Sequence, residues 1–136
     1  QSGVPVMGHL GLTPQSVAAF GGHKVQGRNE DDALRMIDTA KQLQEAGCFA
    51  LVLECVPSRL GEEITRALAI PTIGIGAGDG TDGQVLVLQD LLGMNAEFKP
   101  KFLRHYADGF ATLQGAVNQY HADVASAAFP GVEERY

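Results

Sequence analysis

The strongest indication of the fold lies at residues 49–57, which read FALVLECVP. The five apolar residues Phe49–Leu53 are typical of a strand in a parallel sheet whose two faces are both covered. A helix is predicted ahead of this strand, roughly from Asp31 to Ala46, because apolar residues recur three and four apart and acidic residues crowd the first turn. Gly47 marks its end. These residues therefore predict a helix followed by a strand of a parallel βα unit.

Three further apolar runs predict strands on either side of this unit. They are Val4–Met7, Thr72–Ile75 and Val85–Leu88. A shorter helix is predicted from Glu62 to Leu68, with Pro71 just beyond it. The order is then strand, helix, strand, helix, strand, strand and helix, which indicates an α/β chain with a parallel sheet.

The C-terminal part of the chain carries one apolar stripe with spacings of three and four residues. We expect one or two helices from about Pro100, because Gly109 and Gly115 lower helix propensity and indicate a break. The stripe is expected to pack as core against the sheet or a neighbouring subunit, and a coiled-coil seam is the alternative. Residues from Pro130 to Tyr136 are expected to form a surface segment. The stripe consists of Leu103, Tyr106, Phe110, Leu113, Val117, Tyr120, Val124 and Ala127.

The composition disfavours several classes of protein. The 136 residues include 10 Lys and Arg against 16 Asp and Glu, a net charge of −6, which suits neither nucleic acid nor an anionic membrane surface. No apolar run approaches the roughly 20 residues that cross a bilayer, and the first residues lack a signal-peptide pattern. Cys48 and Cys55 are expected to be reduced, buried thiols, which indicates a cytoplasmic protein.

The length limits the choice of architecture. A complete (β/α)8 barrel needs about 250 residues, whereas this chain has 136. Four parallel strands also leave long apolar edges that need cover. The residues alone leave two alternatives open, a small open α/β domain or half of a larger one.

Glu54 is the leading candidate for a catalytic residue. Working side chains in parallel sheets gather beyond the C-terminal ends of the strands, and Glu54 directly follows such an end. Desolvation between apolar neighbours disfavours the charged carboxylate and suits a general base at neutral pH. The alternative is a buried structural carboxylate that pairs with Lys24 or Arg28.

His9 is the second candidate, because it follows the first predicted strand and is expected to project toward the same rim as Glu54. It suits a ligand, a base or a hydrogen-bond donor to a substrate oxygen. The alternative is a histidine that only ties a loop to backbone carbonyls. His23, His105 and His121 offer less, because no pair of histidines has metal-ligand spacing; the last two are expected on the terminal helices.

Two glycine-rich segments complete the candidate site. Gly74, Gly76 and Gly78 fail the G-x-G-x-x-G dinucleotide fingerprint at its last glycine, so a backbone that a ligand approaches closely is the better interpretation. The loop Gly21–Arg28 carries two basic side chains and suits either a flap over an anionic ligand or a subunit contact. Asp90 is expected to cap a helix rather than to act in catalysis.

Several segments together resemble the ketopantoate hydroxymethyltransferase family, and the likeness runs nearly from end to end. Each segment alone is a weak signal, whereas their order is highly specific. The segments are Gly8–Val17, Phe20–Gly22, Val25–Arg28, Leu51–Pro57, Ile70–Gly78, Thr81–Gln84, Phe129–Gly131 and Glu133–Glu134.

The resemblance implies an α/β fold of the (β/α)8 TIM-barrel type. Residues 1–136 are then a single partial domain that supplies strands five to eight and the C-terminal helices. The family's first half carries the carboxylates that bind Mg²⁺ and a lysine that contacts substrate, so no metal ligand is expected in this chain. The resemblance also implies a homodecamer in which this half pairs with the N-terminal half of the same barrel.

The implied reaction transfers a hydroxymethyl group from 5,10-methylenetetrahydrofolate to 3-methyl-2-oxobutanoate and gives 2-dehydropantoate. Mg²⁺ chelated by the keto acid would stabilise the enolate as a Lewis acid. Glu54 matches the family's general base, which removes the C3 proton, and His9 matches a histidine that binds the substrate or the new hydroxyl. Two other hypotheses are a related barrel that cleaves carbon–carbon bonds in a Mg²⁺-bound 2-oxo acid, and an inactive assembly fragment.

Overall fold

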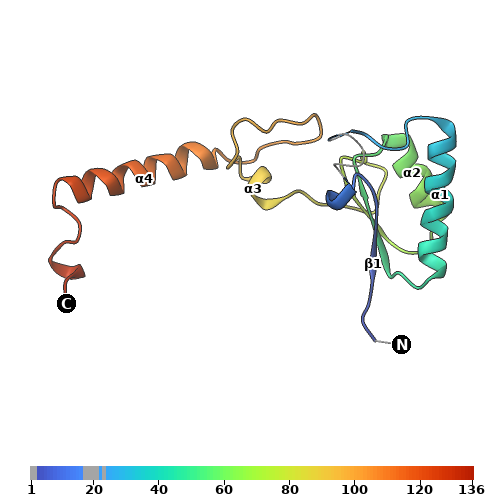
Figure 1. Ribbon diagram of the computed structural model, residues 1–136, viewed down its shortest axis with the longest axis horizontal. Coiled ribbons are helices and arrows are strands. Elements are labelled where there is room, and N and C mark those ends of the chain that lie inside the picture. The colour runs from blue at the N-terminus through green and yellow to red at the C-terminus, as the bar shows by residue number, and fades with distance from the viewer. Residues whose placement is uncertain (1–2, 17–21, 23) are drawn as a thin grey trace. The chain divides into compact units, whose positions relative to one another are not determined.

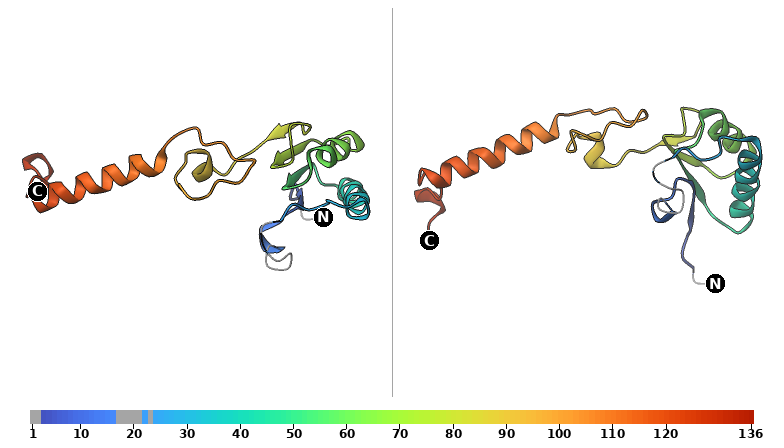
Figure 2. Two further views of the ribbon diagram at one scale, coloured as in Figure 1. Left: turned by 90° about the horizontal axis from the view of Figure 1, so that it is seen from above. Right: turned by 45° about the horizontal axis from the view of Figure 1, so that its top comes forward.

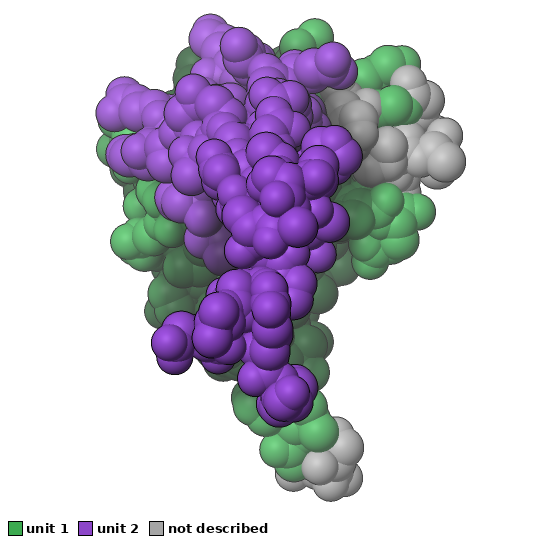
Figure 3. Space-filling view, turned by 90° about the vertical axis from the view of Figure 1, so that its left-hand side faces the viewer, with its two compact units in different colours: residues 1–85 green, residues 86–136 purple. Residues whose placement is uncertain are grey.

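The computed structural model describes residues 3–16, 22 and 24–136. Contacts divide the chain into two compact units, residues 1–85 and residues 86–136 (Figure 3). Of the residues named above, Val17, Phe20, Gly21 and His23 lie outside the described part of the chain. That the whole chain belongs to one partial domain stays a prediction.

The first unit is built on a parallel sheet of four strands. They are β1 (Met7–Gly11), β2 (Ala50–Glu54), β3 (Thr72–Ile75) and β4 (Gly83–Gln84), in the spatial order β1-β2-β3-β4 (Figure 1, Figure 2). Every neighbouring pair is parallel. The prediction of parallel βα units is confirmed, and β3 has the predicted bounds.

The first strand lies further along the chain than Val4–Met7, the run predicted from apolarity. Val4 and Val6 are 68% and 54% exposed, and β1 pairs with β2 only from Met7 onward. His9 consequently lies within β1 and not in a loop after it. The strand thus follows the backbone pairing with β2 and not the apolar run; ahead of Met7, the Val6 carbonyl still accepts a hydrogen bond from the Phe49 amide at 3.0 Å.

The second and fourth strands are shifted as well. β2 excludes Phe49, which is 49% exposed, and ends on Glu54 itself. The predicted fourth strand, Val85–Leu88, is wrong, because β4 is the short pair Gly83–Gln84. The Val85 amide still donates to the Gly74 carbonyl at 3.0 Å, and the first unit ends at this residue.

Two helices pack on the sheet, α1 (Glu30–Glu45) and α2 (Ser58–Ala67). The Asn29 side-chain oxygen accepts a hydrogen bond from the Asp32 amide at 2.8 Å and so caps α1. Gly47 follows its end with φ +96°, a left-handed conformation that glycine adopts without a steric penalty. The helix is confirmed to within one residue at each end, whereas α2 starts four residues before the predicted Glu62.

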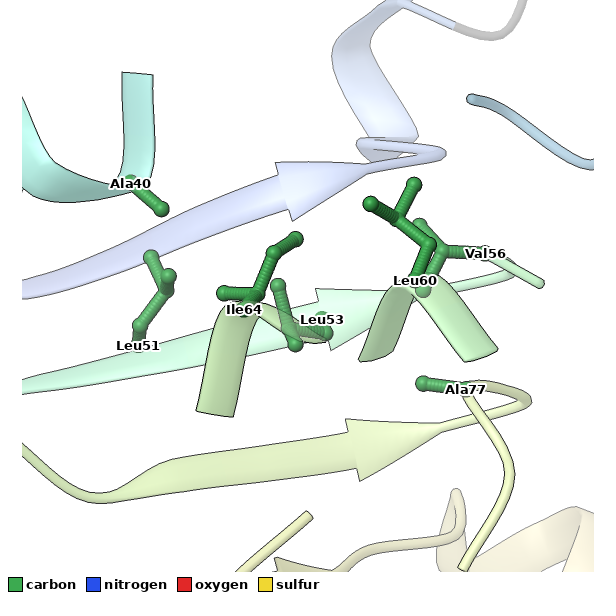
Figure 4. Close-up of a cluster of buried hydrophobic side chains, with 7 residues drawn as sticks. All are labelled: Ala40, Leu51, Leu53, Val56, Leu60, Ile64 and Ala77. Atoms are coloured by element: carbon green, nitrogen blue, oxygen red, sulfur yellow. The ribbon is translucent and has the colours of Figure 1, made fainter. Parts of the chain in front are cut away.

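The core of this unit lies between α1, α2 and one face of the sheet (Figure 4). Leu51, Leu53 and Ile64 are fully buried there. Successive residues of a strand point to opposite faces, and Val52 and Glu54 on the other face of β2 are only partly buried. In the described chain the helices therefore cover one face of the sheet, not both as the apolar run predicted. The cluster comprises Ala40, Leu51, Leu53, Val56, Leu60, Ile64 and Ala77.

The second unit contains the short helix α3 (Leu88–Leu91) and the long helix α4 (Gly109–Ala125). Asp108 caps α4, since its Oδ1 accepts the Ala111 amide at 3.2 Å. The helix starts at Gly109 and not near Pro100, as predicted from the stripe, and it passes through Gly115 without a break. Two short 3-10 helices, Pro14–Ser16 in the first unit and Val132–Glu134 in the second, complete the described elements.

The apolar stripe on α4 is not covered by the other described residues of the second unit. No residue of α4 is buried, and Val117 near its middle is 65% exposed. That the stripe packs against the sheet or a neighbouring subunit stays a prediction. The C-terminal segment is exposed, as expected, apart from the partly buried Gly131.

Two smaller expectations for this unit, on Asp90 and His105, need correction. Asp90 lies inside α3, whose N-cap position is Val87, so it is not the predicted cap. His105 lies in the segment before α4, whereas His121 lies on α4 as expected. No described helix combines the length and apolar character needed to span a membrane.

Candidate catalytic site at the carboxyl end of the sheet

Glu54 is the last residue of β2 and lies on the face of the sheet that α1 and α2 leave uncovered. Leu53 before it is fully buried and Val56 after it is 3% exposed, so its apolar neighbours hold the backbone in place. The Glu54 side chain itself is 23% exposed. The carboxylate is thus partly desolvated and still accessible.

His9 lies on the same face, one strand away. The register of the parallel pair aligns His9 with Val52 and Gly11 with Glu54. Residues two apart on a strand share a face, so the His9 and Glu54 side chains project to the same side. The structure brings them together, with His9 Nε2 lying 3.0 Å from Glu54 Oε2.

The contact between the two groups is close in distance but is not an aligned hydrogen bond. His9 Nε2 is shielded from solvent, yet it has no hydrogen-bond partner of acceptable geometry in the described part of the chain. The 3.0 Å separation of His9 Nε2 and Glu54 Oε2 is within hydrogen-bonding distance, so the two groups form a close polar pair that lacks hydrogen-bond alignment. A buried polar nitrogen left in this state has spare capacity for a further partner.

The structural alternatives for both residues find no support among the described residues. Glu54 forms no ion pair there with Lys24 or Arg28; its ion-pair contact is with His9. No hydrogen bond ties the His9 ring to a backbone carbonyl in the described ranges. The pair is accordingly available for chemistry, although its catalytic role remains a proposal.

Apolar side chains surround the pair on the uncovered face. Val52, Ile73 and Ile75 alternate with the buried residues of β2 and β3 and are all partly exposed. Ile75 is the register neighbour of Glu54, and Ile73 that of Val52. These three side chains were not among the predicted site residues. Side chains alternate between the two faces along each strand, but this pattern identifies the site-facing residues only when the face covered by the helices is known.

Cys55 follows Glu54 in a left-handed conformation with φ +50°, which is unusual for a residue other than glycine. Its amide donates to the Ile75 carbonyl at 2.9 Å, and its carbonyl accepts the Gln26 amide at 2.9 Å. Burial, followed by the negative charge of Glu54, raises the pKa of the Cys55 thiol. Cys55 is therefore held as a thiol at neutral pH and is a poor nucleophile.

The glycine-rich segment that begins within β3 and continues after it packs against other parts of the protein. A methyl group on Gly78 would lie 2.1 Å from Ser58 Oγ at the start of α2, and one on Gly74 would lie 2.6 Å from Thr81 Oγ1. Packing within the protein therefore accounts for glycine at both positions, and the approach of a ligand to this backbone stays a prediction.

The loop Gly21–Arg28 can be placed only in part. Gln26 is tied to the end of β2 through its bond to Cys55, and a methyl group on Gly27 would lie 2.4 Å from Leu60 Cδ2. The C-terminal part of this loop is thus held beside the candidate site. Neither Lys24 nor Arg28 forms an ion pair within the described ranges.

The described residues contain no group of three or more His, Cys, Asp or Glu side chains placed to hold a metal ion.

A family model described as ketopantoate hydroxymethyltransferase matches residues 1–132.

Curated relatives with a common name match almost the whole chain. A 3-methyl-2-oxobutanoate hydroxymethyltransferase of Bdellovibrio bacteriovorus is 64% identical over 135 residues, which cover 99% of this chain and 51% of the relative. One from Francisella tularensis is 54% identical over the same shares. A third, numbered 2 in Bradyrhizobium diazoefficiens, is 58% identical over 98% of this chain and 46% of its own length. The chain thus spans about half the length of the curated relatives it matches.

Proposed function

The chain belongs to the ketopantoate hydroxymethyltransferase family, and from this membership we propose that it carries the proton-transfer residues of such an enzyme. The proposed reaction transfers a hydroxymethyl group from 5,10-methylenetetrahydrofolate to 3-methyl-2-oxobutanoate and gives 2-dehydropantoate, on the route to pantothenate and coenzyme A. The observation that carries the proposal is the Glu54–His9 pair at 3.0 Å on the uncovered face of the sheet.

We propose that β1 to β4 are strands five to eight of a (β/α)8 barrel. Three observations support this assignment. The strands are parallel and lie side by side in chain order, the helices cover only one face, and the chain spans about half the length of its relatives. In such a barrel the helices form an outer ring, and active sites lie at the carboxyl ends of the strands. The uncovered face would then be the interior, with Glu54 at its rim.

Glu54 acts as the general base in this proposal. Its carboxylate takes the proton from C3 of 3-methyl-2-oxobutanoate, and the electron pair of the broken C–H bond forms the enolate. The apolar side chains of Val52, Ile73 and Ile75 limit the water around the carboxylate, which favours proton transfer from carbon. The enolate carbon then attacks the folate-derived methylene iminium, whose C=N π electrons pass to the folate nitrogen. Water next replaces the remaining C–N bond: its oxygen becomes the hydroxyl of the product, and one of its protons goes to the nitrogen of the departing tetrahydrofolate.

His9 binds and orients the substrate in this proposal. Its Nε2 lacks an aligned partner and lies beside the base, so a substrate oxygen or the new hydroxyl at this position would meet a hydrogen-bonding group. His9 donates there in the tautomer that carries a proton on Nε2.

Mg²⁺ is part of the proposed reaction, but the described residues do not fit a magnesium site. No cluster of three or more ligating side chains is present among them, and Mg²⁺ prefers several oxygen ligands in octahedral geometry. We derive no step through the ion, and we propose that its ligands lie in the half of the relatives that this chain does not span.

The test uses the chain joined to the N-terminal half of the Bdellovibrio relative. The joined protein is expected to convert 3-methyl-2-oxobutanoate only when the folate donor is present, and Glu54→Gln is expected to lower kcat by about 10²- to 10⁴-fold. Glu97→Gln, which changes an exposed carboxylate in the second unit, is the matched control and should leave kcat unchanged.

Each alternative has its own outcome in the same assay. Cleavage of the 2-oxo acid without the folate donor would identify a carbon–carbon lyase instead. If the joined protein shows neither activity while sedimenting as a folded assembly, the hypothesis of an inactive fragment is favoured. Near-normal turnover in Glu54→Gln would refute the assignment of the base.

We also propose that the protein forms a homo-oligomer, a decamer by analogy with the family, and that α4 contributes to a subunit contact. The exposed apolar stripe on α4 supports this, because stripes of this kind are normally covered. We propose a cytoplasmic location, supported by two free thiols at Cys48 and Cys55.

A further inference from the structure

The backbone around Glu54 is held by three hydrogen bonds from three different segments. The Leu12 amide donates to the Glu54 carbonyl, the Cys55 amide donates to the Ile75 carbonyl, and the Gln26 amide donates to the Cys55 carbonyl, each at 2.9 Å. The peptide after the proposed base is therefore fixed from the end of β1, the end of β3 and the loop beside it. Such fixation limits where the Glu54 carboxylate can point.

Gly11 makes the first of these bonds possible. It is the register neighbour of Glu54, and its φ of +95° turns the chain so that the next amide, that of Leu12, faces the Glu54 carbonyl. A methyl group on Gly11 would lie 2.0 Å from the Glu54 carbonyl oxygen, 3.0 Å from the carbonyl carbon and 3.0 Å from Val56 Cγ1. These atoms are backbone or buried side chain, so they cannot move aside cheaply.

We propose that Gly11 is a positioning residue for the reaction. Because it carries no side chain, β1 closes onto the Glu54 carbonyl and holds the Glu54 carboxylate opposite His9. His9 lies on the same strand two residues earlier, so any separation of β1 from β2 at Gly11 also changes the spacing of the two functional side chains. The inference rests on the proposed role of Glu54 as general base.

The experiment compares two glycines that have nearly the same φ but differ in their surroundings. Gly11→Ala adds a methyl group that collides with Glu54, in a backbone with φ +95°. Gly47→Ala adds the same methyl group at φ +96°, with no atom within 4 Å. Both substitutions place an alanine at nearly the same positive φ, and only Gly11→Ala also brings the new methyl group against Glu54.

Both variants are made in the protein joined to the N-terminal half, with Glu54→Gln measured in parallel. We expect Gly11→Ala to lower kcat by about 100-fold, the loss associated with displacing a catalytic group by about 1 Å, and to change KM for the keto acid by less than about threefold. Amide hydrogen exchange at Leu12, which reports its bond to Glu54, should become at least about tenfold faster. Gly47→Ala should change neither kcat nor Leu12 exchange.

The outcomes separate this inference from the proposed function. If a folded Gly11→Ala protein keeps kcat within about threefold while Glu54→Gln loses it, the positioning role is wrong and the base role stands. An equal loss in Gly47→Ala overturns the positioning role as well. Normal turnover in Glu54→Gln overturns the base role, and the inference fails with it.

A second variant covers the case in which Gly11→Ala does not fold. Replacing the Leu12 amide by an ester, introduced by semisynthesis, removes the N–H that the Glu54 carbonyl accepts and adds no bulk. A fall in kcat of at least about tenfold supports the positioning role, and an unchanged kcat contradicts it.

Discussion

Removing the Asp82 carboxylate should destabilise the sheet by a measurable and moderate amount. Asp82 precedes β4, and its Oδ2 accepts the Thr72 amide at 2.8 Å and the Thr72 hydroxyl at 3.1 Å. Thr72 is fully buried at the start of β3. At the start of β3, the Asp82 carboxylate thus takes the place of a backbone carbonyl on a neighbouring strand as the acceptor for the Thr72 amide.

The magnitude follows from what each group loses in Asp82→Ala. A buried amide without an acceptor costs about 1–3 kcal/mol. The Thr72 hydroxyl loses less, because it also lies 2.8 Å from Thr65 Oγ1. Asp82 is exposed, so its charge is screened and water can enter the space it leaves. We therefore expect a loss of about 1–2 kcal/mol in the free energy of unfolding.

Urea unfolding of the 136-residue chain, followed by circular dichroism, measures this loss. With a denaturant dependence of about 2 kcal/mol per molar, the midpoint should fall by about 0.5–1 M. Asp82→Asn keeps an acceptor but loses the charge, so about half of that shift is expected. Asp79→Ala, an exposed carboxylate nearby, is the control. A midpoint for Asp82→Ala within about 0.2 M of the parent chain would refute the reasoning.

Two further predictions concern the core and the thiol beside the base. Leu53→Ala should lower the free energy of unfolding by about 2–5 kcal/mol in urea titrations, because the Leu53 side chain is fully buried between the sheet and the helices. The control, Leu34→Ala at a 56% exposed position, should lower it by no more than about 0.5 kcal/mol. Because burial and then Glu54 raise the pKa of Cys55, alkylation of its thiol at pH 8.5, in a Cys48→Ala background, should be slower than that of an unhindered cysteine. Glu54→Gln should speed the reaction only in part, since burial is the larger cause; an unchanged rate would show that the charge has no influence.

The parts of the fold that local patterns specify were predicted well. The bounds of β3 were predicted without error and those of α1 to within one residue, because an apolar run or a capped amphipathic helix contains the information in its own sequence. β1 could not be placed in this way. Its sequence, MGHLG, has two glycines and a histidine, and its strand state comes from pairing with β2.

The candidate site was predictable in its residues but not in its geometry. Glu54 and His9 were identified because each lies near the end of an apolar run, even though the run before His9 proved not to be the strand. Their 3.0 Å separation depends on the register between β1 and β2, which no local pattern contains. The contact between Gly11 and the Glu54 carbonyl depends on the same register and was not anticipated.

The two outer strands of the sheet have a consequence for handling the protein. In the part of the chain that the structure describes, β1 and β4 each pair with one neighbour, so each presents an edge of backbone donors and acceptors to further strands. Under the proposal that β1 to β4 form half of a barrel, pairing of these edges with other copies of the same chain would compete with closure by the N-terminal half. The yield of folded protein should then increase when the N-terminal half is co-expressed in excess, and decrease when this chain is expressed in excess.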